Sequence, residues 1–302
     1  MIEPPPFVPP ADRPTELPLD DFQSLLCDVV ERFRKKIIRN CARNAFVHLK
    51  KAWRLHPLDS EMCLFRAITA EEEAASALIN ALKQQKYPGA KRLNHRSHIH
   101  KSAVWPVFEA IALGASDKKI IAPKLSIRKV GDPFISIEMN VASMAGLDES
   151  LWATPDHLFN FLMYSDENGP FEVHRWEKEF SALAGKRGQS KIFDHIEDEA
   201  NLRNRILYAS DEGVPSIRFS DDVILERLKR VTWLLVATIG VMQTQTSQLF
   251  IVQTLESLLL ALGRFEGQGF SFPEHKRPEG LHLYMEERAE GGMSMEFGKS
   301  KE

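Results

Sequence analysis

"LDSEMCLFRAITAEEEAASALINALKQQ", residues 58–85, has the length and the apolar spacing of one long helix, and it predicts a helical fold. Asp59 or Ser60 can cap its first turn, and the "YPG" that follows ends it. Upstream, apolar residues recur every three or four positions from about Asp20 to Leu55, where "HP" stops the pattern. Two long amphipathic helices joined by so short a turn predict an antiparallel pair.

The rest of the chain has the same helical period, with one interruption. In "KLSIRKVGDPFISIEMN" the apolar residues alternate around Gly131-Asp132, which predicts a β-hairpin of about residues 124–130 and 134–140. We predict further helices at about residues 94–114, 155–164, 172–185, 190–208, 221–242 and 247–263. The fold class expected is mainly α: a helical bundle with a small β-hairpin insertion.

Composition divides the 302 residues into three parts. Residues 1–19 contain seven prolines and predict an extended, disordered leader, although a strap that docks on a partner is the alternative. Residues 20–264 are predicted to form a single helical domain that includes the hairpin. Residues 265–302 are polar and Gly-rich and predict a flexible tail.

Net charge, cysteine spacing and hydropathy argue against a generally basic nucleic-acid-binding protein, a disulfide-linked protein and a membrane protein. A formal net charge of −3 gives no global basic field, so any nucleic-acid contact needs a local patch. Cys27, Cys41 and Cys63 are odd in number and widely spaced, which predicts small core residues in a reducing, cytoplasmic compartment. The most apolar run, residues 231–242, is too short to span a bilayer, so we expect a buried helix and no membrane contact.

Two Arg-Asn pairs are candidates for a site. In "CARNAFVHLKK", Arg43-Asn44 precedes His48, which shares an apolar stripe with Ile37 and Cys41. Five helical residues separate Arg43 and His48 by about 140° around the axis, so they cannot converge in one monomer. We expect His48 to be a partly buried, hydrogen-bonded histidine.

The second pair lies in "NLRNRILYASDEGVPSIRFSDDVILERLKRVTWLL", where an acidic helix ends in Arg203-Asn204, a loop follows and a strongly apolar helix comes next. This order, over about residues 195–242, resembles the HEPN superfamily, whose helical bundles carry Arg-Asn-x-x-x-His before such a loop. The helix with "ITAEEEAASALINAL" is similar to the acidic helix that precedes the motif in these bundles.

The resemblance implies roles for the motif residues. Arg203 takes the place of the arginine that handles phosphate, and Asn204 that of its polar partner. Position 208 should hold the histidine and holds Tyr208, whose phenol is a far weaker base at neutral pH. The resemblance further implies a metal-independent endoribonuclease without a cofactor, a homodimer, and a role in RNA-linked stress or phage defence. The alternative is that Arg203 and Asn204 bind the terminal carbonyls of their helix while Tyr208 fills the loop.

Two further stretches could support this site. "RLNHRSHIHK" is the strongest local candidate for nucleic-acid contact, through Arg92, His95, Arg96, His98, His100 and Lys101, although a solvated helix start is the common outcome. No carboxylate completes a zinc site nearby in sequence, so we predict no metal. In Glu71–Glu73 helical spacing allows at most one or two carboxylates to face a site: Glu72 facing Arg203 as a supporting acid would fit such a bundle, and a charged outer face is the other interpretation.

Two functions remain open from the sequence. The first is a HEPN-like endoribonuclease with an atypical or degenerate Arg-Asn-x-x-x-Tyr site. The second is a non-catalytic helical scaffold that binds a partner protein through its last apolar helices or the leader. The nuclease requires Arg203 and Tyr208 to be exposed in a cleft, whereas the scaffold requires them buried and a large apolar patch elsewhere.

Overall fold

The structure is a computed structural model of the whole chain, and it describes most of the helical part. The described residues are 13–117, 124–128, 134–140, 152–153, 159–163, 173–207, 220–243, 247–263, 282–287 and 293–298. They are mainly helical, as the sequence predicts. The chain divides into two compact units, residues 1–264 and residues 265–302.

The first helices form the predicted antiparallel pair, with one break. The helix α1 (Asp21–Glu31) starts with a capping box in which the Asp20 side chain accepts from the Gln23 backbone N–H and Gln23 accepts from that of Asp20. The chain leaves the helical path at residues 32–35, and α2 (Lys36–Leu55) follows. The prediction of one continuous helix to Leu55 was therefore wrong at this break. Asp59 caps α3 (Ser60–Gln84) through the Met62 backbone N–H.

The predicted third helix is divided. A single 3-10 turn, η1 (Ala90–Arg92), and an extended residue precede the five-residue α4 (His98–Ser102), which Ser97 caps. The helix α5 (Val104–Asp117) starts after Ala103, so Pro106 lies in its first turn, where a missing N–H costs nothing.

Four later helices complete the described part of the first unit. They are α7 (Glu177–Lys186), α8 (Ile192–Leu207), α9 (Asp221–Gln243) and α10 (Leu249–Ala261), and each lies within the stretch predicted for it or extends at most one residue past it. The helix predicted over residues 155–164 was wrong where the structure describes it, because residues 159–163 are not helical.

Two buried glutamines explain why residues 159–163 leave the helical path. The side-chain oxygen of Gln248 accepts the Phe159 backbone N–H at 2.8 Å, and that of Gln253 accepts the Met163 backbone N–H at 3.0 Å. These donors would otherwise be buried without partners, so α10 holds the segment in a non-helical path.

Strands are a minor component of the described residues. In the first unit, β1 (Lys124–Arg128) pairs antiparallel with β2 (Phe134–Asn140), with Ser126 opposite Ser136, and β2 pairs with β3 (Trp152–Ala153). Residues 129–133 lie outside the described residues, so the predicted hairpin insertion stays a prediction. In the second unit, β4 (His282–Glu287) pairs antiparallel with β5 (Met293–Gly298), which the prediction of a loose tail did not include.

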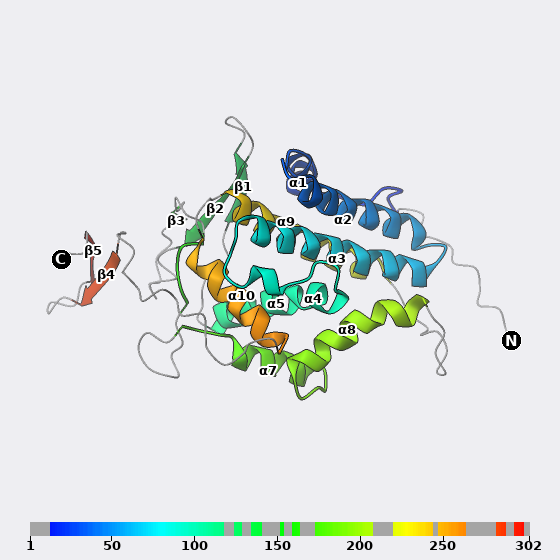
Figure 1. The fold of residues 1–302 in the computed structure, drawn as a ribbon. Coiled ribbons are helices and arrows are strands. Elements are labelled where there is room, and N and C mark those ends of the chain that lie inside the picture. The colour runs from blue at the N-terminus through cyan, green and yellow to red at the C-terminus, as the bar shows by residue number, and fades with distance from the viewer. Residues whose placement is uncertain are drawn as a thin grey trace. The chain divides into compact units, whose positions relative to one another are not determined.

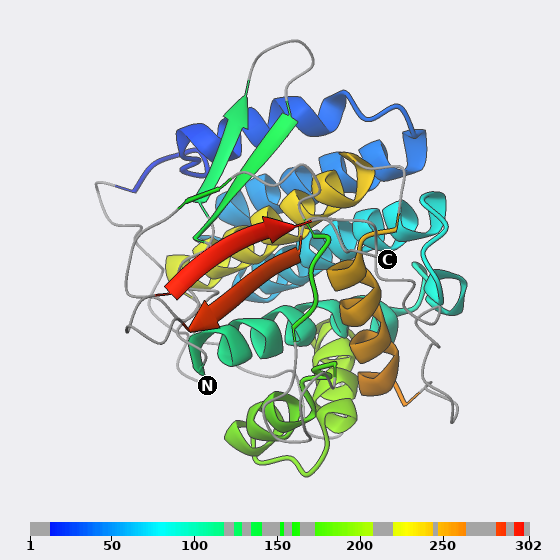
Figure 2. The same ribbon diagram turned by 90° about the vertical axis from the view of Figure 1, so that its left-hand side faces the viewer.

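The core of the first unit is built around α3. This helix contacts α2, α4, α8 and α9, and Figures 1 and 2 show α2 and α8 on opposite sides of it. Cys41 and Cys63 are buried in the core, and burial raises the pKa of both thiols to about 12. No helix among the described residues is both long and apolar enough to cross a bilayer.

A pair of glycine substitutions tests the packing of α9. A Cβ at Gly240 would overlap Cε2 of Phe159, and that ring stacks on Phe250. We expect Gly240→Ala to lower the free energy of unfolding by about 1–3 kcal/mol, because the ring must move. Gly185→Ala is the matched control, since nothing lies near its Cβ, and it should raise stability by up to about 1 kcal/mol. Urea unfolding measures both, and equal effects would contradict the close contact.

Candidate functional site

The buried carboxylate of Glu72, on α3, brings three helices together. Its Oε1 lies 2.6 Å from His98 Nδ1, and its Oε2 lies 3.0 Å from Lys101 Nζ and 3.5 Å from Arg203 Nη1. The Glu72 residue is only 4% exposed. A carboxylate at this depth is unfavourable unless charged partners and hydrogen bonds replace its lost hydration. Glu72 therefore fixes α4 and α8 on α3.

Local structure explains how α4 presents two partners to one carboxylate. The Ser97 side chain accepts from the His100 backbone N–H and starts the helix there. His98 and Lys101 are three residues apart, so their side chains lie on the same face of the helix. That face contacts α8, on which Arg203 lies in the last turns.

Arg203 and His98 are in direct contact at the edge of the protein. Arg203 Nη1 lies 2.9 Å from His98 Nε2 and 3.1 Å from its Nδ1, while the guanidinium packs over the Phe65 ring. The side chains of His98 and Arg203 are 38% and 22% exposed, so a ligand can reach both. Because an ionised carboxylate only accepts, His98 Nδ1 carries the hydrogen toward Glu72, which leaves Nε2 as the acceptor whenever the ring is neutral.

The histidine of the first Arg-Asn motif contacts an arginine of α3. His48 is half-buried on α2, and its Nδ1 lies 3.3 Å from Arg66 Nη1 on α3. Burial lowers the pKa of His48 to about 4, helped by the positive charges of Arg66, Lys51 and Arg203. The prediction of a partly buried, hydrogen-bonded His48 is confirmed. Arg43 points elsewhere and binds Glu31.

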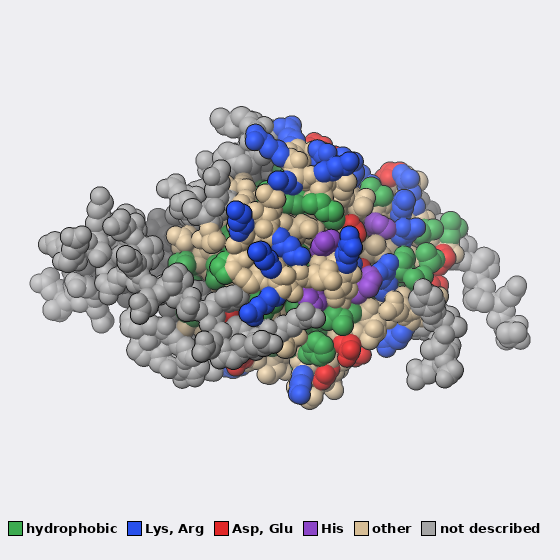
Figure 3. All heavy atoms as spheres, viewed as in Figure 1, with side chains coloured by type: hydrophobic (Ala, Val, Ile, Leu, Met, Phe, Trp, Pro, Cys, Tyr) green, Lys and Arg blue, Asp and Glu red, His purple; other side chains and the backbone are tan. Residues whose placement is uncertain are grey.

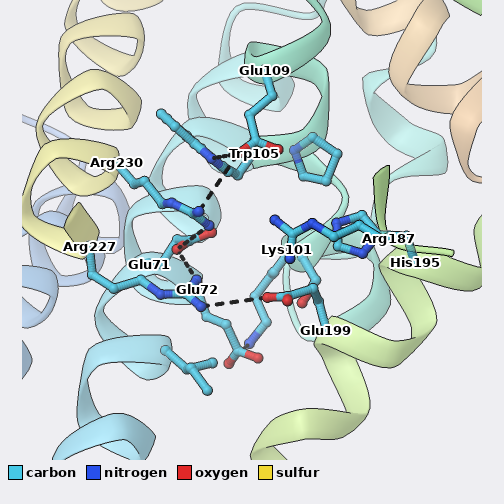
Figure 4. A pocket seen from close by; sticks show the side chains of 13 residues that line it. Glu71, Glu72, Lys101, Trp105, Glu109, Arg187, His195, Glu199, Arg227 and Arg230 are labelled. Atoms are coloured by element: carbon cyan, nitrogen blue, oxygen red, sulfur yellow. Dashed lines mark hydrogen bonds and ion pairs between the residues drawn. The ribbon is translucent and has the colours of Figure 1, made fainter. Parts of the chain in front are cut away.

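Glu71, the neighbour of Glu72, is the centre of a second buried cluster. Its carboxylate binds Arg227 and lies 3.6 Å from Arg230 Nη1, both on α9 (Figure 4). Arg227 also lies 3.5 Å from Glu199 on α8, one helical turn before Arg203. Although burial disfavours its charge, the two carboxylates raise the pKa of Arg227, which stays ionised. This cluster holds α8 and α9 against α3.

A pocket lies between the two clusters. Figure 4 shows its charged lining, which includes Glu71, Glu72, Lys101, Arg187, Glu199 and Arg230. Trp105 donates to Glu109 at 2.9 Å, and Arg230 packs over the Trp105 ring. The lining mixes cations and carboxylates, so it does not favour a ligand of either charge. At the Arg203–His98 edge, by contrast, the described carboxylate in contact is that of Glu72 alone.

The structure places two of the three residues predicted as catalytic. Arg203 binds side chains of α3 and α4 rather than the carbonyls at its own helix end, which the alternative interpretation required. Asn204 is exposed on α8. Tyr208 lies outside the described residues, so the role predicted for it stays a prediction.

The predicted nucleic-acid segment is divided by burial. Arg92 and Arg96 are exposed and His95 is half-buried, with its pKa lowered by burial and by Lys83, Arg96 and Lys101. His100 is 2% exposed and accepts the Asn94 backbone N–H at 2.8 Å. Lys101 is also buried, on Glu72. His100 and Lys101 therefore do not belong to one exposed patch with Arg92 and Arg96.

Glu72 lies against Arg203, which is one of the two arrangements considered from the sequence. The other, a charged outer face, is wrong for Glu71 and Glu72, because both are buried. Sequence reasoning missed the contributions of Arg66, Arg227 and Arg230. Among the described residues, no cluster of three His, Cys, Asp or Glu side chains is arranged to hold a metal ion.

Breaking the second cluster should destabilise the protein. Glu71→Gln leaves Arg227 and Arg230 with too little negative charge, and we expect a loss of about 3 kcal/mol in the free energy of unfolding. Glu226→Gln is the matched control, because Glu226 lies 3.6 Å from Arg230 but is half exposed. An exposed pair contributes about 1 kcal/mol at most. Denaturant unfolding of both variants decides, and equal losses would show that burial of Glu71 is unimportant.

His48 should make stability depend on pH. Its pKa is about 4 in the folded chain and 6.5 ordinarily, so the unfolded chain takes up the proton first. The stability that the neutral ring contributes is present above pH 6.5 and is lost as the pH falls toward 4. We expect His48→Asn, which keeps an acceptor for Arg66, to lose less in Tm between pH 7 and pH 5 than the wild type. The same loss in both proteins would refute the assignment.

Comparison with known proteins adds no family to these observations. No family model matches the chain, and no curated protein or solved structure matches it either. The chemistry of the site therefore rests on the contacts described above.

Proposed function

We propose that the chain is a HEPN-like, metal-independent endoribonuclease in which His98 takes the part of the histidine that position 208 lacks. The observation that carries the proposal is the contact of Arg203 Nη1 with His98 Nε2, at 2.9 Å, held by the buried Glu72. An imidazole and a guanidinium side by side at an accessible edge are the groups that RNA cleavage without a metal requires.

Each group has a definite role in this chemistry. His98 Nε2 takes the proton from a ribose 2′-hydroxyl, the 2′-oxygen bonds to the adjacent phosphorus, and the bond from phosphorus to the 5′-oxygen breaks. The products are a 2′,3′-cyclic phosphate and a 5′-hydroxyl, and the leaving oxygen takes a proton from the phenol of Tyr208 or from water. Arg203 neutralises the charge that develops on the phosphate, and its release of Nε2 to do so frees the base.

Glu72 supports His98 from behind. Its hydrogen bond to Nδ1 fixes the ring and its tautomer, and its negative charge stabilises the imidazolium that forms during the reaction. Lys101 binds the other carboxylate oxygen and compensates the negative charge of Glu72 in its buried position. Asn204, the exposed neighbour of Arg203, takes the part of the polar partner that the resemblance assigns to it.

The protein-binding scaffold gains less support. The large apolar side chains exposed among the described residues are Ile37, Val47, Leu58 and Leu207, and none lies on α9 or α10, one of the two docking surfaces expected. Most of the other, the Pro-rich leader, lies outside the described residues. The homodimer and the role in RNA-linked stress or phage defence follow from the HEPN resemblance and stay predictions.

An RNA cleavage assay in EDTA tests the proposal. We expect the wild type to cleave single-stranded RNA to 2′,3′-cyclic phosphate ends, and His98→Gln to lower kcat by about 10²–10⁴-fold. Arg203→Ala should lose at least as much. Arg205→Ala is the matched control, because Arg205 lies exposed on the same helix and, among the described residues, donates to the Asp198 carbonyl alone, so activity should persist.

The other outcomes are equally definite. Full activity in His98→Gln together with its loss in Tyr208→Phe would move the acid–base role to Tyr208. No cleavage by the wild type, or the same low activity in every variant, would refute the nuclease proposal. The protein-binding scaffold would then be the better hypothesis.

A further inference from the structure

The strongest concentration of charge in the chain is on α2 and the turn before it. Residues 32–54 contain no Asp or Glu but hold nine of the 39 Lys and Arg residues, in a chain whose formal net charge is −3. These residues are Arg32, Arg34, Lys35, Lys36, Arg39, Arg43, Lys50, Lys51 and Arg54. All of them are exposed except Arg39, which is half-buried. Such a local excess of positive charge favours a polyanionic partner.

Helical geometry arranges part of this charge in a line. Lys36, Arg43 and Lys50 follow one another at intervals of seven residues, which return to nearly the same side of the helix about 10.5 Å further along. The opposite side is apolar and packs on α3 through residues such as Ala42 and Leu49. The line therefore faces away from the core. Figure 3 shows Lys and Arg side chains over the α1–α2 region of this face.

Little negative charge compensates the line. Arg43 binds Glu31 and Arg54 binds Glu16, but both pairs are exposed, and such pairs contribute little against solvent and salt. Within the described ranges, no ion pair joins Lys36, Lys50 or Lys51 to a carboxylate. These ammonium groups are free to meet phosphates.

The line continues into the Arg203–His98 edge. One residue after Lys50, Lys51 lies on the side of α2 that carries His48, and His48 contacts Arg66 on α3. The positive charges of Lys51, Arg66 and Arg203 all act on the His48 ring. Positive groups of α2, α3 and α8 therefore lie within electrostatic range of one imidazole.

We propose that α2 is the surface on which single-stranded RNA docks, with its phosphates along Lys36, Arg43 and Lys50, and that Lys51 and Arg66 lead the strand to Arg203. The assignment of RNA as the strand rests on the proposed function. Docking of this kind recognises the phosphate backbone and not the base sequence, because the lysines supply positive charge but no specific hydrogen bonds to base edges.

An anionic membrane is the competing partner for a basic helix, and the structure favours RNA. Membrane-surface helices insert a broad apolar face, whereas the apolar face of α2 is occupied by α3. On the remaining surface of α2, the large apolar side chains exposed are Ile37 and Val47, which lie on different turns among the cations.

Equilibrium binding of a labelled 20-nucleotide 2′-O-methyl RNA, read by fluorescence anisotropy across a salt series, tests the proposal. The probe keeps its phosphates but cannot be cleaved, so the measurement stands even if the chain has no nuclease activity. The variant is Lys36→Gln/Lys50→Gln, and the matched control is Lys186→Gln/Lys191→Gln, which removes two exposed lysines near α7 and α8.

Each phosphate contact with a single strand contributes about 0.7 to the slope of log K against log salt. The α2 variant should therefore lower the slope by about 1.4 and weaken binding about twentyfold at about 0.1 M salt. The control variant should bind as the wild type does. Equal weakening in both pairs, or no binding by the wild type, would overturn the proposal. Loss of binding to phosphatidylserine vesicles in the α2 variant, with RNA binding unchanged, would assign the surface to a membrane instead.

Discussion

Two adjacent buried carboxylates on α3 are the constraint on which the arrangement of the helices depends. Glu71 and Glu72 point about 100° apart around one helix, so each must find its cations on different neighbours. Glu71 takes them from α9, and Glu72 from α4 and α8. Apolar packing alone would allow these helices to slide and rotate, whereas charges buried at this depth accept few positions. The residues of the proposed site are thus brought together because the buried Glu72 carboxylate needs cationic partners.

Most helices could be predicted because their signals are local. Asp59, one of the two caps predicted for α3, caps it in the structure, and the end of α8 lies within one residue of the prediction. The break between α1 and α2 was not predicted because Val29, Phe33 and Ile37 continue the apolar period of four residues across it. The non-helical path of residues 159–163 was not foreseeable, since it is fixed by Gln248 and Gln253 some 90 residues away.

In the candidate site, too, features set by local sequence could be predicted, whereas contacts between residues far apart in the sequence could not. The expectation that Glu72 faces Arg203 came from helical spacing combined with a resemblance. The contact of Arg203 with His98 joins residues 105 positions apart, and no local pattern distinguishes it from the other histidines of that segment. The burial of Lys101 could not be predicted either, because the composition of a basic, His-rich stretch is typical of exposed segments.

The shortness of α4 sets a limit on the proposed site. A helix of five residues has almost no stability of its own, so His98 and Lys101 stay in place only while Glu72 and α8 hold them. Local opening of this segment costs less free energy than unfolding the bundle. The fraction of molecules with an assembled site therefore falls on heating before the long helices melt. Moderate heating would therefore disassemble the proposed site while leaving the circular dichroism of the protein almost unchanged.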